Sequence, residues 1–334
     1  MNIDKDIAHI VYATDDKFAE VLGVSLVSLY HNSRDMKDII IYILDSGISD
    51  ENKKKIVSVS RQYDRTEPVF IPATDICGKL GMNVSVDRGS LSQYARLFVS
   101  SDLPSDLSRV IYLDCDILIE KSIRRLWNLD LQGKTIAALM DAFSKQYRKN
   151  IGLEKNDIMF NSGVMVIDLE CWKDKNVESR LLEFIVQKKG RIQQGDQGAL
   201  NHVLSHETFC FEPRFNAVTI FFDFTYKEML TYRNPPVFYP EALVAEAVDD
   251  PDIVHFTTSI FSKRPWIEGC HHKYVDHWIT YKAQSPWKDQ PLWKDNRSGI
   301  KKFVSKSFNL LPKKMAVHIA GILQVHIRPF VNSL

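Results

Sequence analysis

Two acidic side chains follow a strongly apolar run and are the clearest candidates for chemistry in this sequence. The run 110–113 leads directly into Asp114, Cys115 and Asp116. Two like charges side by side at the buried end of a strand are costly unless a cation binds them. A hard divalent ion binds such oxygen ligands, and Mg²⁺ or Mn²⁺ that bridges to a diphosphate is the usual arrangement for Asp-x-Asp. The pattern therefore predicts a metal site at Asp114 and Asp116.

Phosphatases with an aspartate nucleophile also place Asp-x-Asp after a strand, and they are the competing enzyme class. They usually carry Thr or Val two residues beyond the second Asp, whereas this chain has Leu118. Their motif usually follows the first strand, whereas this one lies well inside the chain. The pattern therefore favours metal binding over a phosphatase.

His255 follows a second apolar run and is a candidate third ligand, because imidazole is an acceptable ligand for Mn²⁺. A lone histidine after an apolar strand is more often a satisfied core or rim residue. The metal interpretation requires His255 to converge with Asp114 and Asp116, and the sequence leaves that point open.

Polar residues in three further segments could bind a sugar or a phosphate, and each also has a structural explanation. Asn161 and Ser162 could bond sugar hydroxyls or form a turn before a buried strand. Asp196 and Gln197 fall at a predicted helix start, where an aspartate can simply cap the helix. Arg96 could pair with phosphate or with an aspartate at the sheet end, or could be a surface helix charge.

Short β-branched runs alternate with longer amphipathic stretches and must position these residues. This order predicts an α/β fold with an open, mostly parallel sheet that helices flank on both faces. Ligands of such sheets bind outside the carboxyl ends of the strands, where three of the predicted strands end in aspartates. The predicted strands are 7–12, 39–44, 68–71, 109–113, 135–140 and 163–167, and the predicted helices are 18–31, 51–63, 92–101 and 177–188.

Composition limits the class of protein. The 334 residues are 45% hydrophobic and 25% charged, as in soluble globular proteins, and the net charge of +1 gives no reason to expect a nucleic-acid partner. Five widely spaced cysteines without a C-x-x-C motif indicate reduced thiols rather than a disulfide framework. The acidic N-terminus does not resemble a signal peptide, and no run approaches the roughly 20 apolar residues of a membrane span. We therefore expect a cytoplasmic protein.

The C-terminal segment differs from the rest of the chain. Asp295 is the last of the 42 acidic residues, and seven of the 43 basic residues follow it. We expect a catalytic body at 1–290 and a basic, amphipathic, helical tail at 291–334. Such a tail can lie in an anionic membrane surface, or it can pack on the body. The apolar residues at helical spacing are Ile300, Phe303, Val304, Leu310 and Leu311, followed by Met315, Ile319, Ile322, Leu323 and Phe330.

The order of the motifs resembles that of the family 8 glycosyltransferases. These are retaining enzymes of the A-type nucleotide-sugar fold and include bacterial lipopolysaccharide galactosyl- and glucosyltransferases and the glycogenins. The resemblance covers about residues 7 to 285. Segments 10–16, 94–97, 112–118, 160–164 and 196–201 match in order, and 255–266 resembles the family's closing H-x-x-G…K-P-W motif.

The resemblance implies a role for each matching residue. Asp114 and Asp116, which flank Cys115, should hold Mn²⁺, or Mg²⁺, together with His255. Arg264 matches a lysine that contacts phosphate. Gln197 matches the residue beneath the reacting anomeric carbon. The resemblance further implies uracil and ribose contacts for Ala13, Thr14 and Asp15. Arg96 and Asp141 should contact the donor sugar or orient the residues beside it, and the sugar pocket should be lined by Asn161, Ser162, Asp196 and Gln197.

Four departures from the family pattern bear on these roles. Gly198 replaces the second aspartate of D-Q-D, and Lys17 stands where some relatives have a polar residue near the uridine. The segment 257–263 is longer than usual and lacks the family's glycine. Arg264 keeps the charge of the family's lysine but changes its geometry.

The resemblance implies transfer of glucose or galactose from a UDP-sugar to a hydroxyl of a saccharide, such as lipopolysaccharide or another surface glycan. The side chain of Gln197 is an amide, which is a poor nucleophile. We therefore favour same-face attack of the acceptor, in which the departing phosphate takes the acceptor's proton. Two alternatives remain. One is glycogenin-like self-glucosylation on one of the 12 tyrosines, and the other is a non-catalytic nucleotide-sugar-binding protein at the membrane surface.

Overall fold

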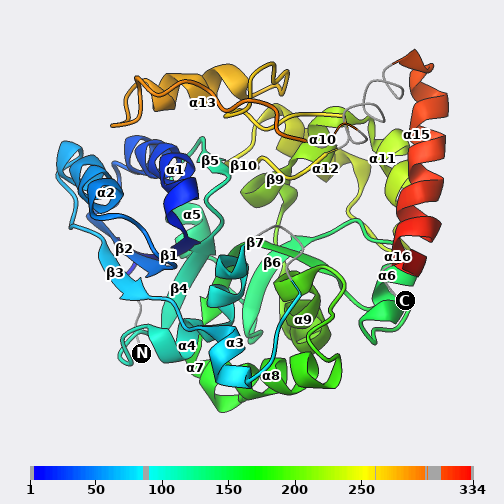
Figure 1. The fold of residues 1–334 in the computed structure, drawn as a ribbon, viewed down its shortest axis with the longest axis horizontal. Coiled ribbons are helices and arrows are strands. Elements are labelled where there is room, and N and C mark those ends of the chain that lie inside the picture. Colours follow the sequence, from blue (N-terminus) through cyan, green and yellow to red (C-terminus); the bar gives the residue numbers. More distant parts are fainter. Residues whose placement is uncertain (1–3, 86–89, 260, 298, 300–309, 332–334) are drawn as a thin grey trace.

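A seven-stranded sheet forms the centre of the molecule (Figure 1). The structure is a computed structural model that describes residues 4–85, 90–259, 261–297, 299 and 310–331. Within the described residues the strand order is β3-β2-β1-β4-β7-β6-β8. All neighbours pair in parallel except β7, which runs antiparallel to β4 and to β6. The prediction of an α/β fold with an open, mostly parallel sheet is confirmed. The strands are β1 Ile7–Thr14, β2 Asp38–Asp45, β3 Val69–Pro72, β4 Arg109–Leu113, β6 Ile136–Met140, β7 Phe160–Asp168 and β8 Thr208–Cys210.

Helices cover both faces of the sheet, and a second, three-stranded sheet adjoins the first (Figure 1). Its order is β5 (Ile117–Ile119), β10 (Ile253–His255) and β9 (Ala217–Val218). The short turns of helix are η1 Asp16–Phe18, η2 Leu91–Phe98, η3 Ser205–Glu207, η4 Pro213–Asn216 and the π-helix η5 Leu323–Ile327. The α-helices are α1 Ala19–Asn32, α2 Asp50–Gln62, α3 Ile76–Leu80, α4 Val99–Asp102, α5 Arg124–Trp127, α6 Lys145–Asn150, α7 Leu169–Asp174, α8 Val177–Gln187, α9 Gly195–Leu204, α10 Thr219–Asp223, α11 Tyr226–Arg233, α12 Glu241–Asp249, α13 Val275–Lys282, α15 Lys313–Ile322 and α16 Arg328–Val331.

The central strands are apolar because both of their faces are covered. In β1, Ile10 and Tyr12 pack into one hydrophobic cluster, whereas Val11 between them packs into a second cluster on the other face. This alternation follows from the two-residue period of a strand. The sheet is thereby held rigidly between two cores, which fixes the positions of its strand ends.

Two predicted elements differ from the observed ones. The segment 92–101 was expected to be one α-helix, but it is the 3₁₀ turn η2 followed by the short helix α4. Strand β7 begins at Phe160, so Asn161 and Ser162 lie inside the strand and the interpretation of a preceding turn was wrong. All five cysteines lie in the described part of the chain and are free thiols, as predicted.

The described part of the tail packs on the body, which is one of the two arrangements that the sequence left open. Helix α15 lies beside α11 at the edge of the molecule (Figure 1), and Ala316, Val317 and Ala320 belong to the main hydrophobic cluster. A methyl group on Gly321 would lie 2.8 Å from the carbonyl oxygen of Thr231, so the two helices meet at close range.

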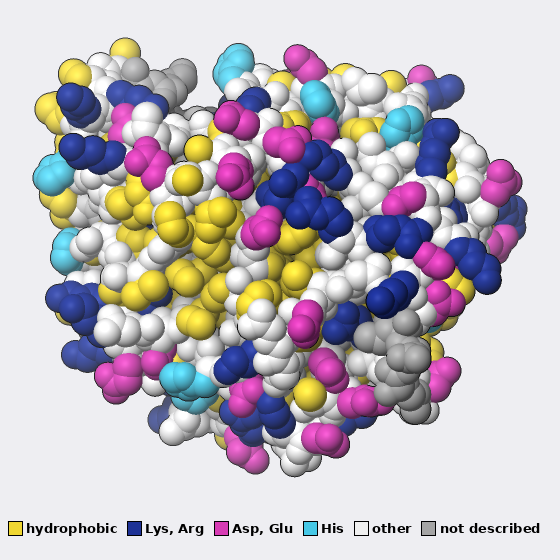
Figure 2. Space-filling model, turned by 180° about the vertical axis from the view of Figure 1, so that it is seen from behind, with side chains coloured by type: hydrophobic (Ala, Val, Ile, Leu, Met, Phe, Trp, Pro, Cys, Tyr) yellow, Lys and Arg dark blue, Asp and Glu magenta, His cyan; other side chains and the backbone are white. Residues whose placement is uncertain are grey.

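The opposite side of this helix is apolar and exposed. Figure 2 views the molecule from behind. On this rear face of the molecule, apolar side chains gather on the half that lies nearest α15 and α16. The predicted run within 300–309 lies outside the described residues. Within the described ranges, no helix combines the length and the apolar character that a membrane crossing needs. The exposed apolar residues of the tail are Leu310, Met315, Ile319, Ile322, Leu323, Ile327, Phe330 and Val331.

Candidate active site

The three predicted metal ligands converge at the end of the central strand β4. Asp114 and Asp116 lie in the turn between β4 and β5, and β5 pairs antiparallel with β10, whose last residue is His255. One ligand atom from each residue can be chosen so that all three lie within 4.8 Å of one another. His255 Nε2 is 3.2 Å from Asp116 Oδ1 and 3.8 Å from Asp114 Oδ2. The convergence that the sequence left open is therefore present.

The histidine presents its Nε2 atom to the two carboxylates. Asn216 Nδ2 donates to Asn161 Oδ1 at 3.0 Å, which directs the Asn216 carbonyl oxygen toward His255 Nδ1, also at 3.0 Å. An amide oxygen only accepts, so Nδ1 is the donor in this contact and Nε2 is the ring nitrogen that faces the carboxylates. Nε2 is buried and makes no hydrogen bond to any residue that the structure describes. A ring nitrogen that faces two carboxylates without a hydrogen bond fits a bound cation, and the donor set of one nitrogen and carboxylate oxygens suits a divalent metal.

Gly163 gives the site the space that it needs. A Cβ atom at this position would lie 2.2 Å from His255 Cε1 and 2.9 Å from Asp114 Oδ2. Neither Gly163 nor Asn216 was identified from the sequence as a site residue. Gly163 lies in the N-S-G-V segment that was singled out, but Asn216 lies in no recognisable motif.

Arg96 joins the metal ligands to the helix that carries Gln197. Its guanidinium lies 2.6 Å from Asp114 Oδ1 and 3.0 Å from Asp196 Oδ2, and it donates to the carbonyl oxygen of Ser162 at 2.8 Å. Burial alone would lower the pKa of Arg96, but the neighbouring Asp114 and Asp196 raise it overall. The interpretation of Arg96 as a surface charge was wrong. Asp196 is likewise no N-cap, because Gln194 occupies that position in α9.

The predicted sugar-pocket residues come together from three elements. Gln197 Oε1 accepts from Ser162 N at 3.3 Å and from Ser162 Oγ at 3.4 Å, and Asn161 Nδ2 donates to Asp141 Oδ2 at 3.4 Å. All four side chains are largely buried. Gln194 and Gly195, with φ of 69° and 55°, form a left-handed turn at the N-cap and first residue of α9. That turn starts the helix at the point where Gln197 faces β7.

The predicted nucleotide contacts lie at the carboxyl end of β1. Asp15 accepts from Phe18 N at 3.2 Å and from Ser90 Oγ at 3.0 Å, a contact that the sequence did not indicate. Ala13 and Thr14 are the last residues of β1. Cys115 donates from Sγ to the carbonyl oxygen of Ala13 at 3.4 Å, and burial raises the pKa of its thiol. Cys115 therefore contributes a packing contact between β1 and the acidic turn.

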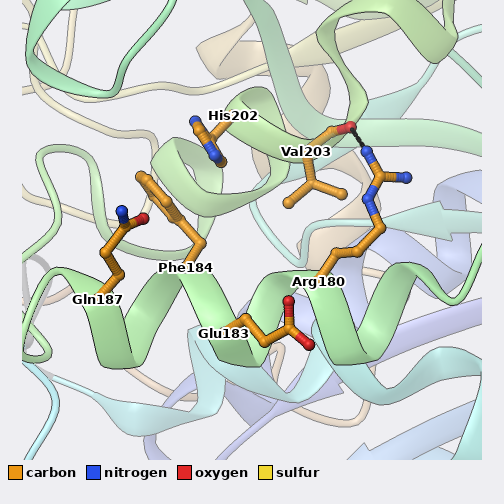
Figure 3. A pocket seen from close by; sticks show the side chains of 6 residues that line it. All are labelled: Arg180, Glu183, Phe184, Gln187, His202 and Val203. Atoms are coloured by element: carbon orange, nitrogen blue, oxygen red, sulfur yellow. Dashed lines mark hydrogen bonds between the residues drawn. The ribbon is translucent and has the colours of Figure 1, made fainter.

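A hollow of about 430 Å³ lies apart from this group of residues, between α8 and α9 (Figure 3). Phe184 and His202 stack there with ring centroids 3.8 Å apart, and His202 Nδ1 bonds the carbonyl oxygen of Ile151 at 2.7 Å. None of the predicted site residues lines this hollow. Its lining consists of Arg180, Glu183, Phe184, Gln187, His202 and Val203.

The fold and the site define a glycosyltransferase: residues 9–269 match Glycosyl transferase family 8, and the chain belongs to that family. General stress protein A of Bacillus subtilis (strain 168) is 30% identical over 286 residues, which cover 84% of this chain and 95% of that protein. Lipopolysaccharide 1,2-glucosyltransferase of Escherichia coli (strain K12) is 25% identical over 287 residues, with 84% and 79% covered.

A solved structure has the same fold. The galactosyltransferase LgtC, in complex with donor and acceptor sugar analogues, superposes with a TM-score of 0.69 at 23% sequence identity. The similarity covers 83% of this chain and 96% of that chain. The predicted A-type glycosyltransferase fold is thereby confirmed, together with the family that the sequence motifs resembled.

Proposed function

We propose that this glycosyltransferase moves a hexose, with retention, from UDP-glucose or UDP-galactose to a hydroxyl of a surface saccharide such as lipopolysaccharide. The observation that carries the proposal is the group of Asp114, Asp116 and His255, in which a buried ring nitrogen without a hydrogen bond faces two carboxylates. That arrangement suits a divalent cation beside a diphosphate. The names of the relatives, a glucosyltransferase and a galactosyltransferase, agree with hexose transfer.

The residues divide the chemistry among them. Asp114, Asp116 and His255 would hold Mn²⁺, with Mg²⁺ as the second choice, and the bound ion would supply Lewis-acid stabilisation of the departing UDP. Arg96 keeps Asp114 and Asp196 in place. Other predicted contacts remain as the sequence implied them: Ala13, Thr14 and Asp15 to the nucleoside, Asp141, Asn161, Ser162, Asp196 and Gln197 to the sugar, and Arg264 to the phosphates.

Gln197 is the candidate beneath the anomeric carbon. Ser162 donates to its amide oxygen, which orients that oxygen and reduces its nucleophilicity further. We therefore favour same-face attack, in which the departing phosphate oxygen takes the proton of the acceptor hydroxyl. The positive charge that develops on the sugar ring would be stabilised by the amide dipole of Gln197, as electrostatic preorganisation requires.

The test measures UDP release from UDP-glucose and UDP-galactose with and without Mn²⁺, for the wild-type protein and for Asp116→Asn. We expect metal-dependent hydrolysis of one donor that the substitution abolishes. Binding of UDP and Mn²⁺ without any turnover would support the non-catalytic alternative instead. An increase of intact protein mass by whole hexose units would support self-glucosylation.

The tail carries the second part of the proposal, with residues 1–290 as the catalytic body and 291–334 as a membrane-associating segment. The exposed side of α15 and α16 is apolar, and Lys313, Lys314 and Arg328 lie on the same helical segment. A helix of this composition can bind an anionic surface, at roughly 1 kcal/mol for each basic residue. We propose that it places the enzyme on the cytoplasmic membrane surface, where a glycolipid acceptor would be found.

Vesicle sedimentation tests this placement with substitutions that are chosen to leave the tail folded. Ile319→Ser with Phe330→Ser removes two exposed apolar side chains and leaves the packed side of the helix intact. We expect weaker binding to anionic vesicles than for the wild type. Val186→Ser is the control, because Val186 is 50% exposed, between Ile319 and Phe330, but lies on α8. Binding that survives the double substitution, or that ignores lipid charge and salt, would contradict the proposal.

A further inference from the structure

Arg264 forms an ion pair with one of the candidate metal ligands. Its Nη2 lies 3.1 Å from Asp116 Oδ2 and donates to Thr258 Oγ1 at 3.0 Å, and the guanidinium carbon lies 5.4 Å from the ring centroid of Trp266. The side chain of Arg264 is only 21% exposed. A charge pair so shielded from water interacts more strongly than a pair on an open surface.

The same carboxylate faces the metal position. Asp116 Oδ1 lies 3.2 Å from His255 Nε2, and the proximity of these two atoms to Asp114 identifies the side on which a cation would bind. A divalent ion held there would share the Asp116 carboxylate with the guanidinium of Arg264. Two positive groups a few ångströms apart repel each other, so Arg264 opposes metal binding for as long as it stays in this position.

Arg96 contrasts with Arg264 in its freedom to move. Arg96 is buried and bonds Asp114, Asp196 and Ser162 at once, so it is a permanent part of the site. Arg264 is partly exposed, and its contacts include Asp116 and the nearby Thr258 and Trp266. Because its side chain reaches water, the Arg264 guanidinium can rotate more easily than the enclosed guanidinium of Arg96.

The backbone on the N-terminal side of Arg264 is held in place. Asp223 accepts hydrogen bonds from the hydroxyls of Ser259 and Ser262, and Cys270 donates from Sγ to the carbonyl oxygen of Lys263 at 3.0 Å. A change in the position of the guanidinium is therefore a side-chain rotation and needs no displacement of the segment.

We propose that Arg264 couples metal binding to diphosphate binding. In the free enzyme its guanidinium neutralises Asp116 in competition with the metal. The diphosphate attracts the guanidinium away from Asp116, so each ligand strengthens the binding of the other. This inference rests on the proposed function, and it concerns the replacement of the family's lysine by arginine. The planar fork of arginine donates in several fixed directions, which suits a side chain with two alternative anionic partners.

The experiment measures Mn²⁺ affinity by isothermal titration calorimetry, with and without saturating UDP, so that no turnover is needed. Arg264→Gln should bind Mn²⁺ alone about tenfold more tightly than the wild type, within the usual range of coupling between two sites. The factor by which UDP strengthens Mn²⁺ binding should fall by a similar amount. By linkage, the effect of Mn²⁺ on UDP affinity must fall equally, which checks the measurement internally.

Lys263→Gln is the matched control. It removes the same charge one residue away, but Lys263 Nζ lies 3.6 Å from Asp295 and donates to the carbonyl oxygen of Glu268, not to a metal ligand. Both Mn²⁺ affinities should change less than about twofold. A similar increase in Mn²⁺ affinity for both variants would reduce the effect to general electrostatics and would overturn the proposal.

Two further outcomes separate this proposal from the proposed function. If Arg264→Gln binds Mn²⁺ alone no more tightly than the wild type, the competition does not exist, whereas metal-dependent hydrolysis by the wild type would still support the proposed function. If Asp116→Asn leaves Mn²⁺ affinity unchanged, the metal lies elsewhere, and both proposals fail.

Discussion

Substitution of Gly163 by alanine tests the geometry of the metal group most directly. The added methyl group would lie 2.2 Å from His255 Cε1, 2.8 Å from His255 Nδ1 and 2.9 Å from Asp114 Oδ2. Carbon atoms in contact are normally about 3.5–4.0 Å apart, so the imidazole must move by roughly 1 Å or more. Because β7 pairs on both sides and is buried, its backbone yields little, and the displacement falls on the two ligands.

The size of the effect follows from the tolerance of metal coordination. Ligand distances in metal sites vary by only about 0.2 Å, so a displacement of about 1 Å misplaces Nε2. We expect Mn²⁺ affinity to fall by about 10–100-fold, the usual consequence of disturbing the groups that orient a ligand. Overpacking should also lower the free energy of unfolding by about 1–3 kcal/mol without preventing folding.

The assay combines Mn²⁺ titration by calorimetry with urea unfolding followed by circular dichroism. Gly299→Ala is the control, because among the described residues the same methyl group meets no atom within 4 Å and the backbone there does not have a positive φ. It should leave Mn²⁺ affinity and stability unchanged. If Gly163→Ala retained wild-type Mn²⁺ affinity, the arrangement of His255 and Asp114 described here could not be the metal site.

Three further predictions concern other residues. Arg96→Ala leaves buried Asp114 and Asp196 without their counter-ion and should lower the free energy of unfolding by about 3–5 kcal/mol, whereas an unchanged urea midpoint would contradict the pairing. Gln197→Ala should lower kcat by about 10–10³-fold with little change in donor KM, and a loss confined to KM would make it a binding residue. Burial lowers the pKa of His272 to about 4, so the unfolded chain binds the extra proton between pH 6.5 and pH 4. Stability should therefore fall by up to roughly 3 kcal/mol as pH drops through that window, and His272→Gln should remove this part of the slope in pH-dependent urea unfolding.

The two acidic metal ligands at the end of β4 could be predicted from the sequence, because their recognition depends only on a local sequence pattern. An apolar run followed by Asp114 and Asp116 predicts both the strand and its acidic end without knowledge of the rest of the fold. The role of His255 could only be inferred by resemblance. Its position depends on the antiparallel pairing of β5 with β10, and no local rule relates strands so far apart in the sequence.

A residue that orients a candidate metal ligand, without being a ligand itself, could not be identified from the sequence for a physical reason. Asn216 orients His255, yet a single asparagine at the end of a short 3₁₀ turn has no distinctive spacing. Ser162 was predicted as a site residue, but the start of its strand β7 was predicted three residues too late, because that strand inserts antiparallel between β4 and β6. The sequence did not decide whether the C-terminal helix packs on the body or lies in a membrane surface. An amphipathic helix buries its apolar side equally well in either place.

The close packing of α15 has a geometric consequence for any surface that the enzyme binds. Gly321 brings α15 against the backbone of α11, and Ala316 and Ala320 lie in the main core. The helix therefore cannot rotate about its own axis, so a bilayer bound to its outer side would meet the catalytic body at one fixed tilt. A flexible tether would let the active site sample many heights above the lipid. A rigidly packed helix would fix the height of the active site above the lipid. The enzyme would then select acceptors by the distance of their hydroxyl from the membrane as well as by their chemistry.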